Sequence, residues 1–120
     1  TTFGGHPVSC AAAEANLRTL LNGNFSEKVA MIEETAKKIL LGPGIREVRG
    51  RGAMLGMELE SADLTEKVVG RCKQEGIILG WTLHSNTLVR LAPPLILEHE
   101  VWEKSLKLIR GVIEEIHQSS

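Results

Sequence analysis

Residues 46–60 read REVRGRGAMLGMELE, and their pattern differs from that of the sequence on either side. Apolar side chains recur there at every second position, at Ala53, Leu55, Met57 and Leu59. Strict alternation of this kind predicts a half-buried β-strand over residues 53–60. Residues 46–50 predict a shorter strand before it, with a turn or bulge at residues 50–52 between the two. The centre of the chain is therefore expected to form part of a sheet.

Two helices are predicted before this sheet. The first runs from about Val8 to Leu21, with Pro7 in its first turn and Asn22-Gly23-Asn24 after it. The second begins after Ser26 as the N-cap, with Phe25 packing back on the first turn, and ends at residues 42–44.

Two more helices are predicted after it. Asp63 and Glu66 resemble a capping box that opens a helix ending at Gly76, with an inner face of Leu64, Val68 and Cys72. The last helix runs from about Glu98 to His117. Its apolar stripe consists of Trp102, Leu106, Ile109, Ile113 and Ile116, widened by Val101, Leu108 and Val112.

Two further strands, over residues 77–79 and 87–91, are predicted on either side of a polar turn at His84-Ser85-Asn86. The Ala92-Pro93-Pro94 tripeptide ends the second, because consecutive prolines remove backbone donors from the ladder. Two helices followed by strand–strand–helix–strand–strand–helix predict a small α+β sandwich.

The composition excludes several classes of protein. The chain has 120 residues and a formal net charge of −1, with 42% hydrophobic and 24% charged residues. This balance is typical of a folded domain, and it argues against nucleic acid or an anionic membrane surface as a partner. No apolar run approaches the roughly 18 residues of a membrane span. The two cysteines cannot form a disulfide framework, so a reduced, cytoplasmic setting is expected.

Metal and nucleophile motifs are not apparent. The four histidines show no metal-ligand spacing, the two cysteines lie far apart in sequence, and no Ser/His/Asp nucleophile elbow is visible. A metal site is therefore not expected.

The opening loop has the ingredients of a phosphate site. Thr1 and Thr2 supply hydroxyls, Gly4-Gly5 lets the backbone approach a ligand closely, and a helix N-terminus follows. The alternative is an ordinary lead-in to a helix. The loop matches neither a P-loop nor a dinucleotide fingerprint.

Arg90 is the second candidate. In a strand where Val89 and Leu91 face one side, Arg90 faces the other. A guanidinium on a rigid strand can bind a carboxylate through two parallel hydrogen bonds. The alternative is a solvated arginine on an edge strand.

The chain opens on Thr1-Thr2-Phe3-Gly4-Gly5-His6-Pro7, without an initiator methionine. This start predicts that the chain is a fragment of a longer protein.

Three motifs carry a resemblance to a known family. They are Thr-Phe-Gly-Gly-His-Pro before an Ala-rich helix, RGRGAMLG before MEL (residues 49–59), and VRLAPPL at residues 89–95. In this order the chain resembles the C-terminal part of class III pyridoxal-phosphate aminotransferases, which include acetylornithine, ornithine, 4-aminobutyrate and putrescine aminotransferases. The resemblance covers essentially the whole chain and implies the small C-terminal domain of a fold type I enzyme, with a small, mainly antiparallel sheet covered by helices.

The resemblance also implies roles for two residues. Thr2 matches a threonine that binds the phosphate of pyridoxal 5'-phosphate in the neighbouring subunit of a homodimer. Arg90 matches an arginine that binds the substrate carboxylate. No residue here matches the family's Schiff-base lysine, so no catalytic residue is expected in this chain.

The function implied is transfer of an amino group from an amine or amino acid to a 2-oxo acid by the full-length enzyme, with this chain inactive alone. Residues 1–24 would link to a large domain, and residues 25–120 would form the small domain. The alternatives are a stand-alone interaction or structural domain, or a mutase or epimerase using the same cofactor.

Overall fold

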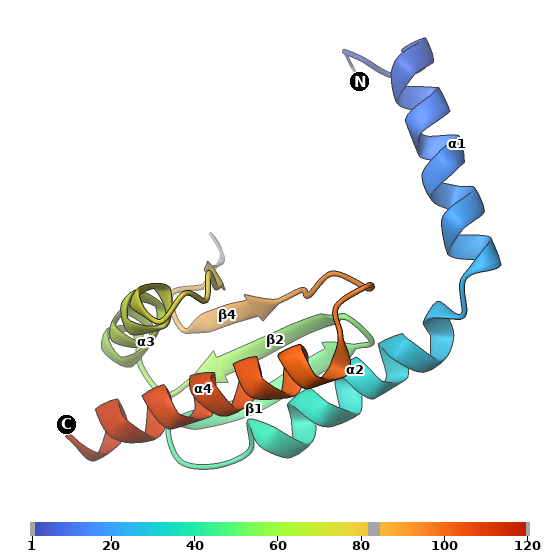
Figure 1. The fold of residues 1–120 in the computed structure, drawn as a ribbon. Coiled ribbons are helices and arrows are strands. Elements are labelled where there is room, and N and C mark those ends of the chain that lie inside the picture. The colour runs from blue at the N-terminus through green and yellow to red at the C-terminus, as the bar shows by residue number, and fades with distance from the viewer. Residues whose placement is uncertain (1, 82–84, 120) are drawn as a thin grey trace.

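The computed structural model describes residues 2–81 and 85–119 (Figure 1). Thr1 and His84, named above in the candidate loop and turn, lie outside the described residues. The elements in chain order are α1 (Pro7–Asn22), α2 (Phe25–Ile39), β1 (Ile45–Arg51), β2 (Met54–Leu59), α3 (Ala62–Gln74), β3 (Gly80–Trp81), β4 (Leu88–Leu91) and α4 (His99–Gln118). The predicted α+β class is confirmed.

The strands form one antiparallel sheet in the order β1-β2-β4-β3. The alternation predicted for residues 53–60 is confirmed, because Leu55, Met57 and Leu59 are buried while Met54 is exposed. The helices α2, α3 and α4 pack on the face to which these buried side chains point, and together they form one core (Figure 1). The opposite face, here called the outer face, carries no helix.

The last helix carries the apolar stripe that its spacing predicted. Trp102, Leu106, Ile109 and Ile113 are buried, and the indole N–H of Trp102 donates to the carbonyl of Ile32 at 3.2 Å. The stripe is narrower on one side than predicted, because Val101 is 49% exposed.

One charged residue of α4 is also buried. Arg110 is buried, and its guanidinium donates to the Pro43 carbonyl at 2.8 Å and to Glu114 at 2.9 Å. The burial of this cation was not predicted. It joins α4 to the loop that follows α2.

Both predicted N-caps are wrong by two residues. The helix α2 already includes Phe25, with Asn24 rather than Ser26 at the N-cap position. The ring of Phe25 occupies the space beside Gly23 and leaves no room there for a side chain. In α3 the cap is Ser61, whose hydroxyl oxygen accepts from the Leu64 amide at 3.2 Å, and Asp63 instead pairs with Lys67.

The strand predicted at residues 77–79 is also wrong, since β3 comprises only Gly80 and Trp81. The amide of Ile77 donates to the carbonyl of Cys72 at 2.8 Å and so belongs to the exit from α3, after Gly76 has turned the chain with φ of 88°. Ile77 and Leu79 are apolar because they pack against the core. Apolar content alone does not distinguish this packing from a strand.

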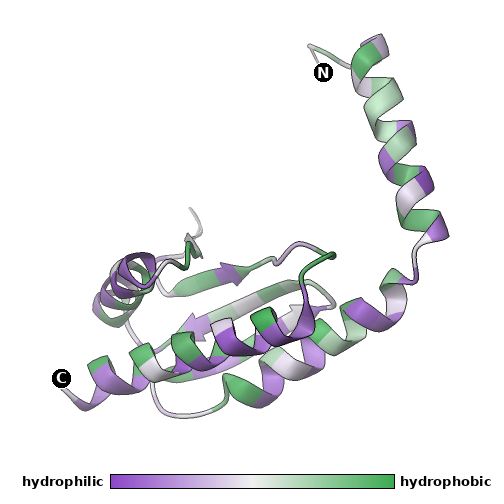
Figure 2. Ribbon diagram, viewed as in Figure 1, coloured by the Kyte–Doolittle hydropathy of each residue, from purple (hydrophilic) through white to green (hydrophobic). Residues whose placement is uncertain are grey.

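The first helix stands away from the sheet (Figure 1) and has no buried residue. It nevertheless carries hydrophobic residues along its length (Figure 2), of which Val8 is 71%, Leu17 55% and Leu21 78% exposed. The division at residue 24 into a linking segment and a domain stays a prediction. None of the helices described is long and apolar enough to cross a membrane.

Candidate functional site

One row of four residues crosses the outer face of the sheet. Arg49 on β1 lies opposite Gly56 on β2, Gly56 lies opposite Arg90 on β4, and Arg90 lies opposite Gly80 on β3. Residues paired across strands share a face, so both arginines of the row project outward. The two arginines are therefore separated by a strand that offers only a glycine between them.

Arg90 points in the direction that the sequence predicted. Val89 is fully buried and Leu91 is 3% exposed, whereas Arg90 is exposed. The strand that carries it lies between β2 and β3, so the alternative of an arginine on an edge strand is wrong. Within the described part of the chain, no acceptor is bonded to its guanidinium, which leaves its donors available to a ligand.

A hollow of about 290 Å³ lies beside Arg90. Its lining residues are Arg49, Gly50, Met54, Leu55, Gly56, Leu88 and Arg90. The hollow thus combines apolar side chains with guanidinium groups, as expected for a site that binds a carboxylate carried on an aliphatic chain. A second cleft, of about 210 Å³, lies between Arg90, the Pro93-Pro94 segment and α4.

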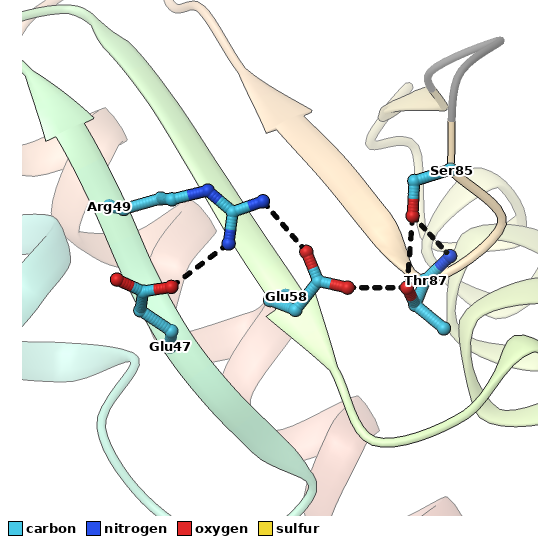
Figure 3. A network of polar contacts seen from close by, with 5 residues as sticks. All are labelled: Glu47, Arg49, Glu58, Ser85 and Thr87. Carbon is cyan, nitrogen blue, oxygen red and sulfur yellow. Dashed lines mark hydrogen bonds and ion pairs between the residues drawn. The ribbon is translucent and has the colours of Figure 1, made fainter.

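Arg49 differs from Arg90 because it is already paired (Figure 3). It donates to Glu47 and to Glu58, each at 2.9 Å. These two carboxylates raise the pKa of Arg49, Glu47 having the larger effect. Arg90 is therefore the arginine of this row that has its charge free for a ligand.

The second oxygen of Glu58 connects β2 to the start of β4 (Figure 3). The Thr87 hydroxyl donates to Glu58, and the Ser85 hydroxyl lies 3.0 Å from that of Thr87. The hydrogen bond from Thr87 is the main cause that lowers the pKa of the Glu58 carboxyl, and Arg49 lowers it further. This network joins the start of the strand that carries Arg90 to β2.

This network was not predicted from the sequence. Arg49 and Glu58 each stand at an outward position of a predicted strand, which is a signal for a cross-strand ion pair. This signal predicts the Arg49–Glu58 pair only when the register of β1 against β2 is known, and the sequence does not give that register.

Thr2 lies in the turn before α1 and is exposed. The His6 amide donates to the Phe3 carbonyl at 3.2 Å, and Gly5 has a left-handed φ of 81°. No side chain caps the N-terminus of α1, and its first turn has no acidic residue. The turn therefore leaves amide donors and a hydroxyl open to an anion such as phosphate.

The structure does not bring Thr2 and Arg90 together. Thr2 precedes α1 at its far end, and a helix of 16 residues is about 24 Å long. The two candidates therefore cannot serve the same ligand within one copy of this chain.

Metal ligands do not gather in the described residues, where no group of three or more His, Cys, Asp or Glu could hold an ion. Cys10 is exposed and Cys72 is buried, and neither forms a disulfide. Burial raises the pKa of the Cys72 thiol to about 11.

Comparison with known proteins gives a consistent result over the whole chain. The family model described as "Aminotransferase class-III" matches residues 1–113. The chain is 34% identical to an ornithine aminotransferase of Bacillus subtilis, over 94% of this chain and 28% of that protein. It is 33% identical to a 4-aminobutyrate aminotransferase of Mycobacterium leprae, over 93% of this chain and 28% of that protein.

Solved structures show the same likeness. An aminotransferase of Bacillus anthracis superposes with a TM-score of 0.81 at 30% identity, over 96% of this chain and 30% of that one. The ornithine aminotransferase of Toxoplasma gondii superposes with a TM-score of 0.86 at 26% identity, over 100% of this chain and 30% of that one. The chain thus spans less than a third of the length of these relatives.

Proposed function

Because this chain belongs to the class III aminotransferase family, we propose that it forms the C-terminal part of an enzyme dependent on pyridoxal phosphate. That enzyme transfers an amino group from an amine or amino acid to a 2-oxo acid. The observation that supports this most strongly is Arg90, an outward cation with free donors beside an apolar hollow.

In this proposal Arg90 binds the carboxylate of the 2-oxo acid. Two parallel hydrogen bonds from a planar guanidinium fix both the position and the plane of a carboxylate. The Glu58–Thr87 hydrogen bond holds the start of β4, so that Arg90 stands on a strand fixed at both sides. Arg90 orients the substrate and does not itself transfer a proton.

Thr2 and the N-terminus of α1 would hold the phosphate of the cofactor. The open hydroxyl, the uncapped amides and the absence of acidic residues in the first turn fit a dianion. When bound, pyridoxal phosphate supplies the electron sink for the transfer. The residues present therefore fit the phosphate group, and the rest of the cofactor would contact parts of the enzyme beyond this chain.

A homodimer accounts for the separation of the two sites. Thr2 of one copy would serve the cofactor of the neighbouring copy, whereas Arg90 would serve its own. The exposed apolar side chains of α1 support this arrangement, because a helix with no buried residue needs a partner to cover them. A cytoplasmic setting fits the two free thiols.

This chain alone would not catalyse the transfer. The family's reaction needs a lysine that bonds to the cofactor. All seven lysines of this chain lie on α2, α3 and α4, which cover the face of the sheet opposite to Arg90. Three of them, Lys37, Lys67 and Lys107, form ion pairs at 2.6 Å one helical turn away.

The test is to express this chain and the longer protein encoded by its full reading frame. After treatment with pyridoxal phosphate and borohydride, none of the lysines of this chain should be labelled selectively, and the chain should show no transamination. The longer protein should be labelled at one lysine outside this chain and should transaminate 2-oxoglutarate. Labelling at one lysine of this chain, or a longer protein without transaminase activity, would contradict the proposal.

A further inference from the structure

Two glycines lie on either side of Arg90, and their backbone conformation does not require them. Gly50 near the end of β1 and Gly52 in the turn that follows have φ of 125° and 62°, where other residues are strained. Gly56 and Gly80 do not have a positive φ. A glycine inside a strand lowers its stability, and it often marks a place that another group approaches closely.

The atoms nearest to each glycine show which group approaches it. A Cβ atom at Gly80 would lie 3.4 Å from the backbone oxygen, 3.5 Å from Nε and 3.6 Å from Cβ of Arg90. The arginine side chain therefore lies over Gly80, in ordinary van der Waals contact with the position that a methyl group would take.

At Gly56 the nearest atoms belong to Leu88 instead, the first of them Cδ1 at 3.0 Å. Gly56 lines the hollow of about 290 Å³ between the two arginines. A methyl group at Gly56 would therefore project into space that a ligand of Arg90 would use. The two glycines thus affect different groups, Gly80 the arginine and Gly56 the ligand.

We propose that Gly56 and Gly80 determine which carboxylates bind Arg90. Gly80 is a positioning residue, because the Arg90 side chain lies over it in van der Waals contact while Arg90 also lines the hollow. Gly56 is a specificity residue, because it leaves room for a carboxylate whose aliphatic carbons lie along Leu88 and Met54. This inference rests on the proposed function of Arg90 as the carboxylate-binding residue.

The test follows the Nε–Hε resonance of Arg90 by NMR in the ¹⁵N-labelled chain. This resonance is assigned because it is lost in the Arg90→Lys variant. The unmodified chain, Gly56→Ala and Gly80→Ala are titrated with formate and with 2-oxoglutarate at low ionic strength, where charge attraction is less screened. Gly70→Ala on α3 and Gly111→Ala on α4 are matched controls, because a Cβ atom at either position meets nothing within 4 Å. Amide spectra establish that each variant is folded.

The expected results differ between the two variants. Gly56→Ala should raise the dissociation constant of 2-oxoglutarate about threefold or more and change that of formate by less than about twofold, because only the larger ligand fills the hollow. Gly80→Ala should shift the Arg90 resonance before any ligand is added and weaken both ligands. Both controls should titrate like the unmodified chain.

Two other results would overturn the inference, and they can be told apart. If Arg90 responds to 2-oxoglutarate but Gly56→Ala and Gly80→Ala titrate like the controls, the glycines have no such role and the proposed function of Arg90 stands. Arg71 on α3, which pairs with Glu75 at 3.0 Å, is the reference arginine. If the Arg90 resonance of the unmodified chain responds no more than that of Arg71, the proposed role of Arg90 fails together with the inference.

Discussion

Replacing Glu58 by Gln tests whether the outer-face network stabilises the strand that carries Arg90. The Glu58 side chain is 17% exposed and accepts hydrogen bonds from Thr87 and, at 2.9 Å, from Arg49. Hydrogen bonds to a charged group contribute about 1.5–3 kcal/mol, whereas a partly exposed ion pair contributes about 0–1 kcal/mol. Gln keeps the shape and can still accept from Thr87. We therefore expect Glu58→Gln to lower the free energy of unfolding by about 1–2 kcal/mol.

Urea unfolding at pH 7, followed by the fluorescence of buried Trp102, measures this loss. A Trp81→Phe background removes the second, 44% exposed indole. Glu14→Gln is the matched control, because the Glu14–Arg18 pair on α1 is exposed at both ends and its loss should change nothing measurable. A double-mutant cycle with Thr87→Val should show coupling between positions 58 and 87.

The loss should also depend on pH. The folded-state pKa of Glu58 lies below its ordinary value of 4.5, mainly because of the Thr87 hydroxyl. The stabilisation is therefore fully present above pH 4.5 and disappears as the pH falls through the folded-state pKa. The difference between the parent and Glu58→Gln should shrink accordingly. Equal stability at pH 7, or additive effects at positions 58 and 87, would refute the reasoning.

Three further predictions concern the core and the first helix. Because burial raises the pKa of Cys72 to about 11, a thiol reagent at pH 8 should label exposed Cys10 and leave Cys72 unlabelled until urea unfolds the chain; rapid labelling of both would contradict the described core. Leu106→Ala should lower the free energy of unfolding by about 2–5 kcal/mol, because Leu106 is fully buried, and a loss below about 1 kcal/mol in urea would be inconsistent with that burial. The exposed apolar side chains of Pro7–Asn22 should make the isolated chain self-associate or leave that helix unprotected in hydrogen exchange; a monodisperse monomer with full protection there would contradict this.

Periodicity predicted those parts of the fold where one face is buried throughout an element. The alternation from Ala53 to Leu59 and the stripe from Trp102 to Ile113 both predicted residues that lie in or against the core. Such patterns are reliable because burial of one face requires a period of two in a strand and 3.6 in a helix.

Errors arose where a residue has two possible uses. Ile77 and Leu79 are apolar enough for a strand, but they cover the exit of α3 instead. Ser61 and Asp63 can both cap a helix, and only the structure shows that Ser61 does so. Arg110 is buried because its guanidinium reaches the Pro43 carbonyl, 67 residues away in sequence.

The candidate site could be predicted only one residue at a time. The direction of Arg90 follows from its neighbours in the strand and is confirmed. Its place in a row with Arg49, Gly56 and Gly80 depends on the register of four strands, which no local pattern specifies. The roles of Thr2 and Arg90 toward ligands remain predictions.

The central claim, that Arg90 binds the carboxylate of the 2-oxo acid, is tested most directly by stopped-flow measurement of each half-reaction in the full-length enzyme. Losing a bidentate pair costs about 2–5 kcal/mol, so Arg90→Ala should slow the half-reaction with 2-oxoglutarate about 30- to 4000-fold. Arg90→Lys should recover part of this loss, and a diamine donor should be far less affected in its own half-reaction. Arg71→Ala, at a half-exposed residue paired with Glu75, should leave both half-reactions unchanged. A 2-oxoglutarate half-reaction of Arg90→Ala within about twofold of the parent enzyme would contradict the claim.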